Sequence, residues 1–222
     1  AATKNVIGKE ALKNRTFVQA HGTGTPQNRT TESHILSQIA GIFGIENWPI
    51  AAVKSYLGHS IASSAGDQLA ATLGSFAHGI LPGILTIDEI AQDVTQENLD
   101  FLLAHRELPL NSIDATIINS KGFGGNNASA SILAPHIVEK MLEKRHGATA
   151  LKDYKKRNQQ VADKTAAYDQ AMIEGRNNTI YKFDHNVLDN ESLEMNESKI
   201  SINEIEPSIS LEFESSYADM CK

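Results

Sequence analysis

The sequence predicts an α/β fold for residues 1–134. Short β-prone runs at residues 16–20, 50–53 and 115–119 alternate with segments whose apolar side chains recur at helical spacing. Such alternation is typical of sheets covered by helices, and ligand sites in these sheets lie beyond the carboxyl ends of the strands. Polar and glycine-rich stretches directly follow all three runs. We therefore expect three loops to converge on one site.

Two helices and a hairpin are predicted around these strands. A helix over residues 31–40 carries three aliphatic side chains on one side and ends at Gly41. Residues 58–79 are rich in Ala, Ser and Gly, which predicts a buried helix packed closely against a neighbour. A returning strand over residues 128–133 follows the glycine-rich loop at 120–127, so a hairpin is expected there.

The composition is that of a globular protein. Of 222 residues, 41% are hydrophobic and 21% are charged, and no apolar run approaches the roughly 20 residues of a membrane span. No signal-peptide core follows the first residues, so a cytoplasmic location is expected. The single cysteine, Cys221, excludes a disulfide framework and a cysteine-based zinc site.

The charge divides the chain into unlike parts. The net charge of −7 comprises −3 in residues 1–134, +4 in residues 135–182 and −8 in residues 183–222. An acidic balance argues against nucleic-acid binding. We expect a domain over residues 1–134 and a C-terminal extension over residues 135–222.

The extension is expected to hold two helices and then an acidic tail of strand and loop. The helices are predicted over residues 135–145 and 153–174, and β-prone pieces follow at 179–183 and 199–202. The last ten residues are expected to be mobile.

Three segments carry residues suited to chemistry. His21 opens a His-Gly-Thr-Gly-Thr-Pro run, Lys54 lies five residues before His59 in Lys-x-x-x-Gly-His, and residues 122–127 read Gly-Phe-Gly-Gly-Asn-Asn. A lone histidine is usually structural, but two histidines and a lysine at three strand ends favour a common site. A metal cluster of both histidines with His34 lacks supporting carboxylate spacing.

In their order and spacing, these motifs resemble the second half of the β-ketoacyl synthases, the condensing enzymes of fatty-acid and polyketide synthesis. The resemblance spans residues 16–133 and leaves out the tail. It implies an α/β fold that is the C-terminal half of the thiolase-like fold, with a mixed five-stranded sheet packed with helices. The helix at 58–79 would then run through the middle of the complete fold.

The resemblance also implies roles for the site residues. His21 and His59 would donate N–H groups to the thioester oxygen of the enolate formed when a malonyl group loses carbon dioxide. Lys54 would be the neighbouring cation, and Phe123 the gate whose backbone N–H serves the oxyanion. The glycines of this gate loop and the supporting residues are Gly122, Gly124, Gly125, Thr23, Thr25, Glu32 and Asn126. No metal or cofactor is implied, because substrates are carried on the phosphopantetheine of acyl carrier protein or of coenzyme A.

The family's nucleophilic cysteine lies in the first half of the fold, which this sequence does not contain, and Cys221 lies in no matching motif. We therefore expect no condensing activity from the chain alone. The implied partners are an N-terminal ketosynthase half, acyl carrier protein and a second copy in a homodimer, with no nucleic acid and no membrane span. A non-catalytic partner of the chain-length-factor type is the alternative, and a thiolase a weaker one; the two histidines count against the former.

Several positions depart from the family. Arg29 stands where many relatives have Asp, Gln68 where some have Glu, and Lys121 where many have Phe, while Glu32 matches an acid that supports the lysine. Lys121 at the mouth of an acyl pocket would change substrate preference or meet a phosphate, although a solvated side chain is the simpler interpretation. The basic residues 155–157 are read as a solvated helix face, with steering of an acidic carrier protein as the alternative.

Overall fold

The computed structural model describes residues 1–176, 181–185, 187, 192–203 and 205–212. The chain forms two compact units, Ala1–Arg157 and Asn158–Lys222. The boundary expected at residue 134 stays a prediction. Each unit is described by itself.

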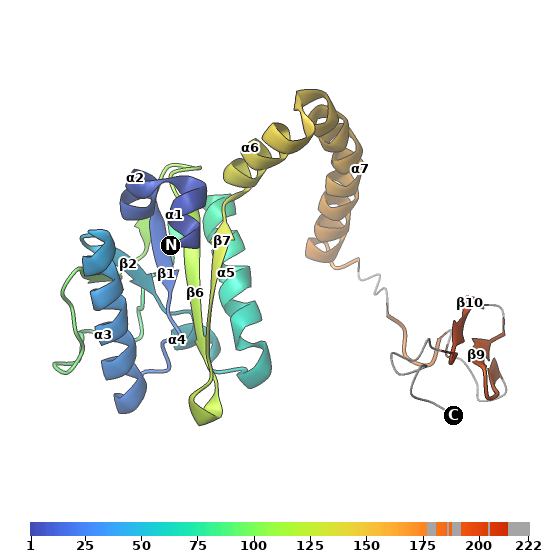
Figure 1. Ribbon diagram of the computed structural model, residues 1–222, viewed down its shortest axis with the longest axis horizontal. Helices are drawn as coiled ribbons and strands as arrows, with labels where there is room; N and C mark the ends of the chain where they lie inside the picture. The colour runs from blue at the N-terminus through green and yellow to red at the C-terminus, as the bar shows by residue number, and fades with distance from the viewer. Residues whose placement is uncertain (177–180, 186, 188–191, 204, 213–222) are drawn as a thin grey trace, which may run out of the picture. The chain divides into compact units, whose positions relative to one another are not determined.

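A mixed five-stranded sheet forms the centre of the first unit, as the resemblance to the β-ketoacyl synthases implies (Figure 1). Its spatial order is β4-β2-β1-β6-β7, and the first four strands are parallel. Only β7 is antiparallel, in a hairpin with β6. The strands are β1 (Thr16–Gln19), β2 (Trp48–Ala51), β4 (Leu99–Phe101), β6 (Ala115–Lys121) and β7 (Asn127–Leu133).

Helices cover both faces of this sheet because alternate residues of the central strands point in opposite directions. From β1, Val18 packs towards α3 (Pro26–Phe43), with Leu36 and Ala40 in the same cluster. Phe17 packs on the other face, where Phe76 of α5 (Ser64–His78) lies against its cluster. Figure 1 shows α3 and α5 on opposite sides of the strands.

The helix predicted to end at Gly41 is longer than expected at both ends. It begins at Pro26, which suits a first helical turn because that turn needs no backbone N–H. It continues through Gly41 and ends where Gly44 adopts a left-handed conformation, φ 64°. Helical spacing of apolar residues located the middle of this helix and not its ends.

The segment predicted as one buried helix is half-buried in the structure. It contains a short 3₁₀ turn, η1 (Ile61–Ser63), and then α5. The side of α5 that meets the sheet is polar and lacks large aliphatic groups, whereas Leu69 and Leu73 are exposed. The buried residues of α5 are Ser64, Gln68, Thr72 and Ser75.

Several short elements were not predicted. The first residues form two short helices, and β4 and a small antiparallel pair of strands lie between α5 and β6. Elements this short lack enough periodicity to be recognised. Apart from β4, the unpredicted elements are α1 (Ala2–Ile7), α2 (Lys9–Asn14), α4 (Lys54–Leu57), β3 (Ile80–Leu81), β5 (Arg106–Glu107) and η2 (Phe123–Gly125). Of these, α4 and η2 are the short turns that follow β2 and β6.

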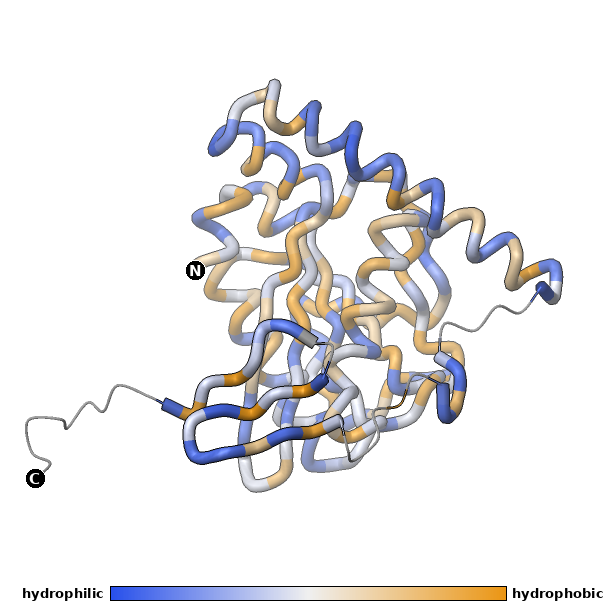
Figure 2. Tube along the Cα trace, turned by 90° about the vertical axis from the view of Figure 1, so that its right-hand side faces the viewer, coloured by the Kyte–Doolittle hydropathy of each residue, from blue (hydrophilic) through white to orange (hydrophobic). Residues whose placement is uncertain are grey.

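The extension begins with the two predicted helices, α6 (Pro135–His146) and α7 (Ala148–Ile173). Figure 2 shows that polar residues predominate along α7. The second unit holds a three-stranded antiparallel sheet in the order β10-β9-β8. These strands are β8 (Leu193–Met195), β9 (Lys199–Ile202) and β10 (Ile205–Ser210).

Of the two β-prone pieces, 199–202 is a strand, while the described part of 179–183, residues 181–183, is not. Residues 179 and 180 lie outside the described residues, as do the last ten, with Cys221 among them. Over the part of the chain that the structure describes, no helix has the length and hydropathy to cross a bilayer.

Candidate active site

The carboxyl ends of three parallel strands bring the predicted site residues together. His21 follows β1, Lys54 follows β2 and Phe123 follows β6. Because β1 lies between β2 and β6, their loops share one edge of the sheet, where α/β folds bind ligands. These three residues and His59 line one cavity of about 1160 Å³.

His21 and His59 form an edge-to-face pair at this edge. Their ring centroids are 5.2 Å apart and their planes meet at 81°. The Nδ1 atom of His21 accepts the backbone N–H of Lys121 at 3.2 Å, and that of His59 accepts the backbone N–H of Ile61 at 3.0 Å. Each neutral ring therefore carries its proton on Nε2. The pair offers two N–H donors from adjacent rings.

The contact to His59 lies beside an unusual backbone conformation. Ile61 has a positive φ of 57°, a region that β-branched residues rarely adopt. The N–H of the same residue donates to the ring of His59. Backbone strain of this kind persists where the surrounding structure requires it.

Glu32 is the buried hub of the site. One carboxylate oxygen accepts the backbone N–H of His21 at 2.8 Å and the amide of Asn119 at 2.6 Å. The other accepts the backbone N–H of Gly22 at 3.0 Å and the amide of Asn28 at 3.0 Å. The carboxylate thus joins β1, α3 and β6 around the first histidine.

Glycine is required at position 22. Gly22 has φ +55°, and a Cβ there would come within 2.8 Å of the Cβ of Ala52. Because that distance is below any ordinary contact, a side chain would force the His21 loop away from β2.

Lys54 places a buried positive group beside the histidines. Its side chain is 7% exposed, and Nζ has no hydrogen-bond partner among the described residues. Burial lowers its pKa, although Glu32 and Asp67 oppose the shift. An ammonium with unused donors favours negative charge developing in the adjacent cavity.

The pKa of His21 is lowered, and the ring is therefore neutral near pH 7. Burial is the largest cause, followed by the charge of Lys54; His59 and Lys121 lower it further, while Glu32 acts in the opposite direction. A neutral ring keeps Nδ1 free to accept its backbone hydrogen bond.

The glycine-rich gate loop closes on itself beyond β6. Gly122 donates its backbone N–H to the carbonyl of Asn126 at 2.8 Å, and the Asn126 amide donates to the carbonyl of Phe123 at 3.2 Å. Gly124 and Gly125 have φ values of 78° and 84°. The Phe123 ring is 88% exposed at the cavity wall.

Thr23 and Thr25 also line this cavity, and their hydroxyl oxygens lie 3.4 Å apart. Thr25 directly precedes α3, at the N-cap position. His34 is exposed on α3 and does not line the cavity. Within the described ranges, no three His, Cys, Asp or Glu residues are grouped as metal ligands would be.

Sequence reasoning missed the polar residues that hold the loops together. Asn28 and Asn119 lie in or beside recognised motifs, but an asparagine gives no signal of a distant carboxylate partner. Gln68 was noticed only as a departure, yet its side chain is fully buried beneath the site. Arg29, another departure, pairs with Asp93 at 2.8 Å.

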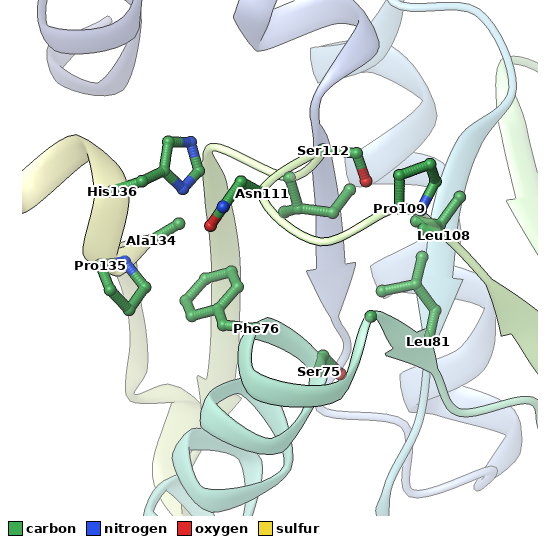
Figure 3. Close-up of a pocket in the computed structure, with 12 residues that line it drawn as sticks. Ser75, Phe76, Leu81, Leu108, Pro109, Asn111, Ser112, Ala134, Pro135 and His136 are labelled. Carbon is green, nitrogen blue, oxygen red and sulfur yellow. The ribbon is translucent and has the colours of Figure 1, made fainter.

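A second, much smaller pocket lies near the amino ends of the strands (Figure 3). It holds about 10 Å³, roughly the space of one water molecule. His136 of α6 lines it, and its Nε2 contacts Asp114 at 2.8 Å. Asp114 also accepts from Arg15 at 2.7 Å, so a buried carboxylate ties α6 to the sheet.

The sequence is similar to known proteins. Residues 4–88 match the family described as β-ketoacyl synthase, C-terminal domain. The β-ketoacyl-[acyl-carrier-protein] synthase FabY of Pseudomonas aeruginosa is 43% identical over 203 residues, 91% of this chain and 32% of that protein. The 3-oxoacyl-[acyl-carrier-protein] synthase 1 of Escherichia coli K12 is 29% identical over 113 residues, 51% of this chain and 26% of that protein. The chain thus spans about a third or less of these relatives.

Solved structures of ketosynthases are also similar to this chain. A crystal structure of the ketosynthase FabY from P. aeruginosa aligns with a TM-score of 0.80 and 39% identity, covering 100% of this chain and 34% of that one. A ketosynthase from module 6 of the bacillaene synthase of Bacillus subtilis 168 has a TM-score of 0.50 and 23% identity over 57% of this chain and 23% of that one, which shows the fold alone. The likeness to FabY includes the tail, which the motif resemblance left out.

Proposed function

The chain belongs to the β-ketoacyl synthase family, whose C-terminal domain it carries, and we propose that it forms the C-terminal part of an enzyme for decarboxylative Claisen condensation. The substrates are an acyl thioester and a malonyl thioester carried by acyl carrier protein. The observation that carries this proposal is the His21–His59 pair, which presents two Nε2–H donors beside Lys54 in one cavity.

In the proposed reaction, the bond between malonyl C2 and its carboxyl group breaks. The electron pair passes into the thioester enolate, and carbon dioxide leaves. His21 and His59 donate to the enolate oxygen, and Lys54 adds a nearby positive charge. The enolate carbon then attacks the acyl group held on a cysteine; the new carbon–carbon bond forms and the thiolate leaves. The backbone N–H of Phe123 serves the tetrahedral oxyanion of acyl transfer.

In this proposal, an N-terminal ketosynthase part supplies the cysteine and the surface that binds the acyl group. The exposed apolar side chains of the α5 region support such a partner, because Ile61, Leu69 and Leu73 are 69%, 37% and 51% exposed. The complete enzyme is a homodimer that works with acyl carrier protein and requires no metal or cofactor.

Co-expression tests the proposal against the non-catalytic alternative. The chain is produced with its N-terminal part, and the assembled protein is given an acyl thioester and malonyl-acyl carrier protein. We expect a 3-oxoacyl product and release of carbon dioxide. A chain-length-factor subunit would give neither without a separate catalytic partner, and that outcome would overturn the proposal.

A further inference from the structure

Gln68 lies beneath the histidine pair at the centre of a set of backbone carbonyl groups. Its side chain is 0% exposed on the sheet-facing side of α5. The two N–H groups of its Nε2 atom are shared among three carbonyls, those of Gln19 at 3.0 Å, Ala20 at 2.7 Å and Asn119 at 3.0 Å. One side-chain amide therefore joins a helix to the carboxyl ends of β1 and β6.

The chemistry of the contacts fixes which atom faces the strands. All three partners are acceptors, so the amide nitrogen must point at them. A glutamate, which some relatives carry here, would offer a single proton when neutral and none when ionised. Gln68 thus provides one N–H donor more than even the neutral acid would.

These contacts connect the two segments that carry the imidazoles. Ala20 immediately precedes His21 in the chain, and α5 begins shortly after His59. The third carbonyl, that of Asn119, lies two residues before Lys121, whose N–H holds the Nδ1 atom of His21. Movement of α5 against β1 would therefore change the separation of the two rings.

We propose that Gln68 is a positioning residue that sets the spacing and orientation of His21 and His59 for a shared oxygen. The inference rests on the proposed function only in assigning a reaction to that pair. The Oε1 atom of Gln68 is buried and has no hydrogen-bond partner among the described residues. An aliphatic side chain would remove this unpartnered acceptor but would also take the amide donor away from the three carbonyls, so we infer that the amide is retained for its N–H groups.

The test uses the complete enzyme with Gln68→Met, which keeps the volume and removes the donors. Malonyl decarboxylation and acyl transfer to the cysteine are measured on the same preparation. We expect the ratio of decarboxylation to acyl transfer to fall at least about 10-fold, because only decarboxylation needs both imidazoles. Thr72→Val is the matched control, since Thr72 is equally buried one turn along α5 and its hydroxyl bonds only the carbonyl of Gln68. We expect it to leave that ratio within about twofold.

Gln68→Glu adds a second measurement, the pH dependence of decarboxylation, which would not change if Gln68 served only in packing. The protonated carboxyl can donate to a carbonyl, whereas the ionised form places a negative charge among three oxygen atoms. Decarboxylation by this variant should therefore fall as the pH rises through the carboxyl pKa, over a range where the wild-type rate is level.

A crystal structure of either variant supplies evidence that does not depend on the reaction. We expect the His21–His59 centroid separation to depart from 5.2 Å. An unchanged separation, an unchanged ratio in Gln68→Met or an equal change in Thr72→Val would each overturn the inference. Absence of decarboxylation in the wild type would instead overturn the proposed function, and the ring separation would still decide the role of Gln68.

Discussion

His21 and His59 lie with ring centroids 5.2 Å apart and planes at 81°, although 38 positions separate them in the sequence. The pair exists because β1 and the segment after β2 end at the same edge of a parallel sheet. The ring of His21 is held by the N–H of Lys121, 100 positions away, whereas the ring of His59 is held by the nearby Ile61. The geometry of the pair therefore depends on several segments that meet at this sheet edge.

Removal of either imidazole should affect decarboxylation most. In the complete enzyme, we expect His59→Ala to lower the rate of malonyl decarboxylation about 10²–10³-fold, the usual effect of losing one oxyanion donor. Release of labelled carbon dioxide measures the step. His34→Ala is the control, because His34 is exposed and lies away from the cavity lining. A wild-type rate in His59→Ala would contradict the assigned role.

The pH dependence should report the lowered pKa of His21. Protonation of Nδ1 would remove its acceptor for the Lys121 N–H, so decarboxylation should hold as the pH falls past 6.5 and decline only at lower pH. Lys54→Met removes a positive neighbour and should move this acid limb to higher pH. Lys121→Met should move it less, since Lys121 is the smallest of the named causes. The variants are compared by the pH at which the rate declines, and not by the size of the rate. A limb that stays in place in Lys54→Met would contradict this account.

Asp114 should contribute stability that depends on pH. Burial raises its pKa, but hydrogen bonds from Arg15 and His136 outweigh burial and the net pKa is lowered. A lowered carboxyl pKa stabilises the fold above its unfolded value of about 3.9 and loses that contribution as the pH falls through the folded value. We expect Asp114→Asn to reduce the free energy of unfolding by about 1–3 kcal/mol at pH 7, and by less near pH 3.

Denaturant midpoints of the complete protein at several pH values measure this difference. Asp93→Asn is a suitable control, because Asp93 pairs with Arg29 on the surface and exposed pairs contribute little. A gap between wild type and Asp114→Asn that stays constant down to pH 3 would be inconsistent with the lowered pKa.

The chain alone should not condense substrates, and Cys221→Ser should leave the complete enzyme unchanged. The reason is that the family's nucleophile lies in the N-terminal half of the fold. Native mass measurement should find the chain with a complementary polypeptide, as the exposed Leu69 and Leu73 suggest. A stable 24.1 kDa monomer with no partner, or an acyl group carried on Cys221 at the rate of turnover, would contradict this prediction.

Sequence patterns predicted the strands that have a strong apolar signature. The runs at 16–20, 50–53, 115–119 and 128–133 all correspond to strands of the central sheet. The three-residue β4 was missed, because its neighbours in the sheet and not its own sequence make it a strand. The polar underside of α5 was also unexpected, since small and polar residues there bond to backbone groups and do not form an apolar stripe.

The site residues also fall into those that the sequence predicted and those that it did not. The motifs led to His21, Lys54, His59 and Phe123, and the structure places all four around one cavity. Their catalytic roles stay predictions. The bonds from Glu32 to Asn119 and from Gln68 to backbone carbonyls join residues far apart in the chain, so no local pattern could reveal them.

Because main-chain N–H groups of Lys121 and Ile61 hold the two Nδ1 atoms, the proton positions of the pair are largely insulated from point mutation. Replacing the side chain at either position leaves the amide in place, and only proline removes it outright. A substitution at position 121 therefore changes the side chain beside the cavity and leaves the backbone donor that sets the tautomer of His21 in place.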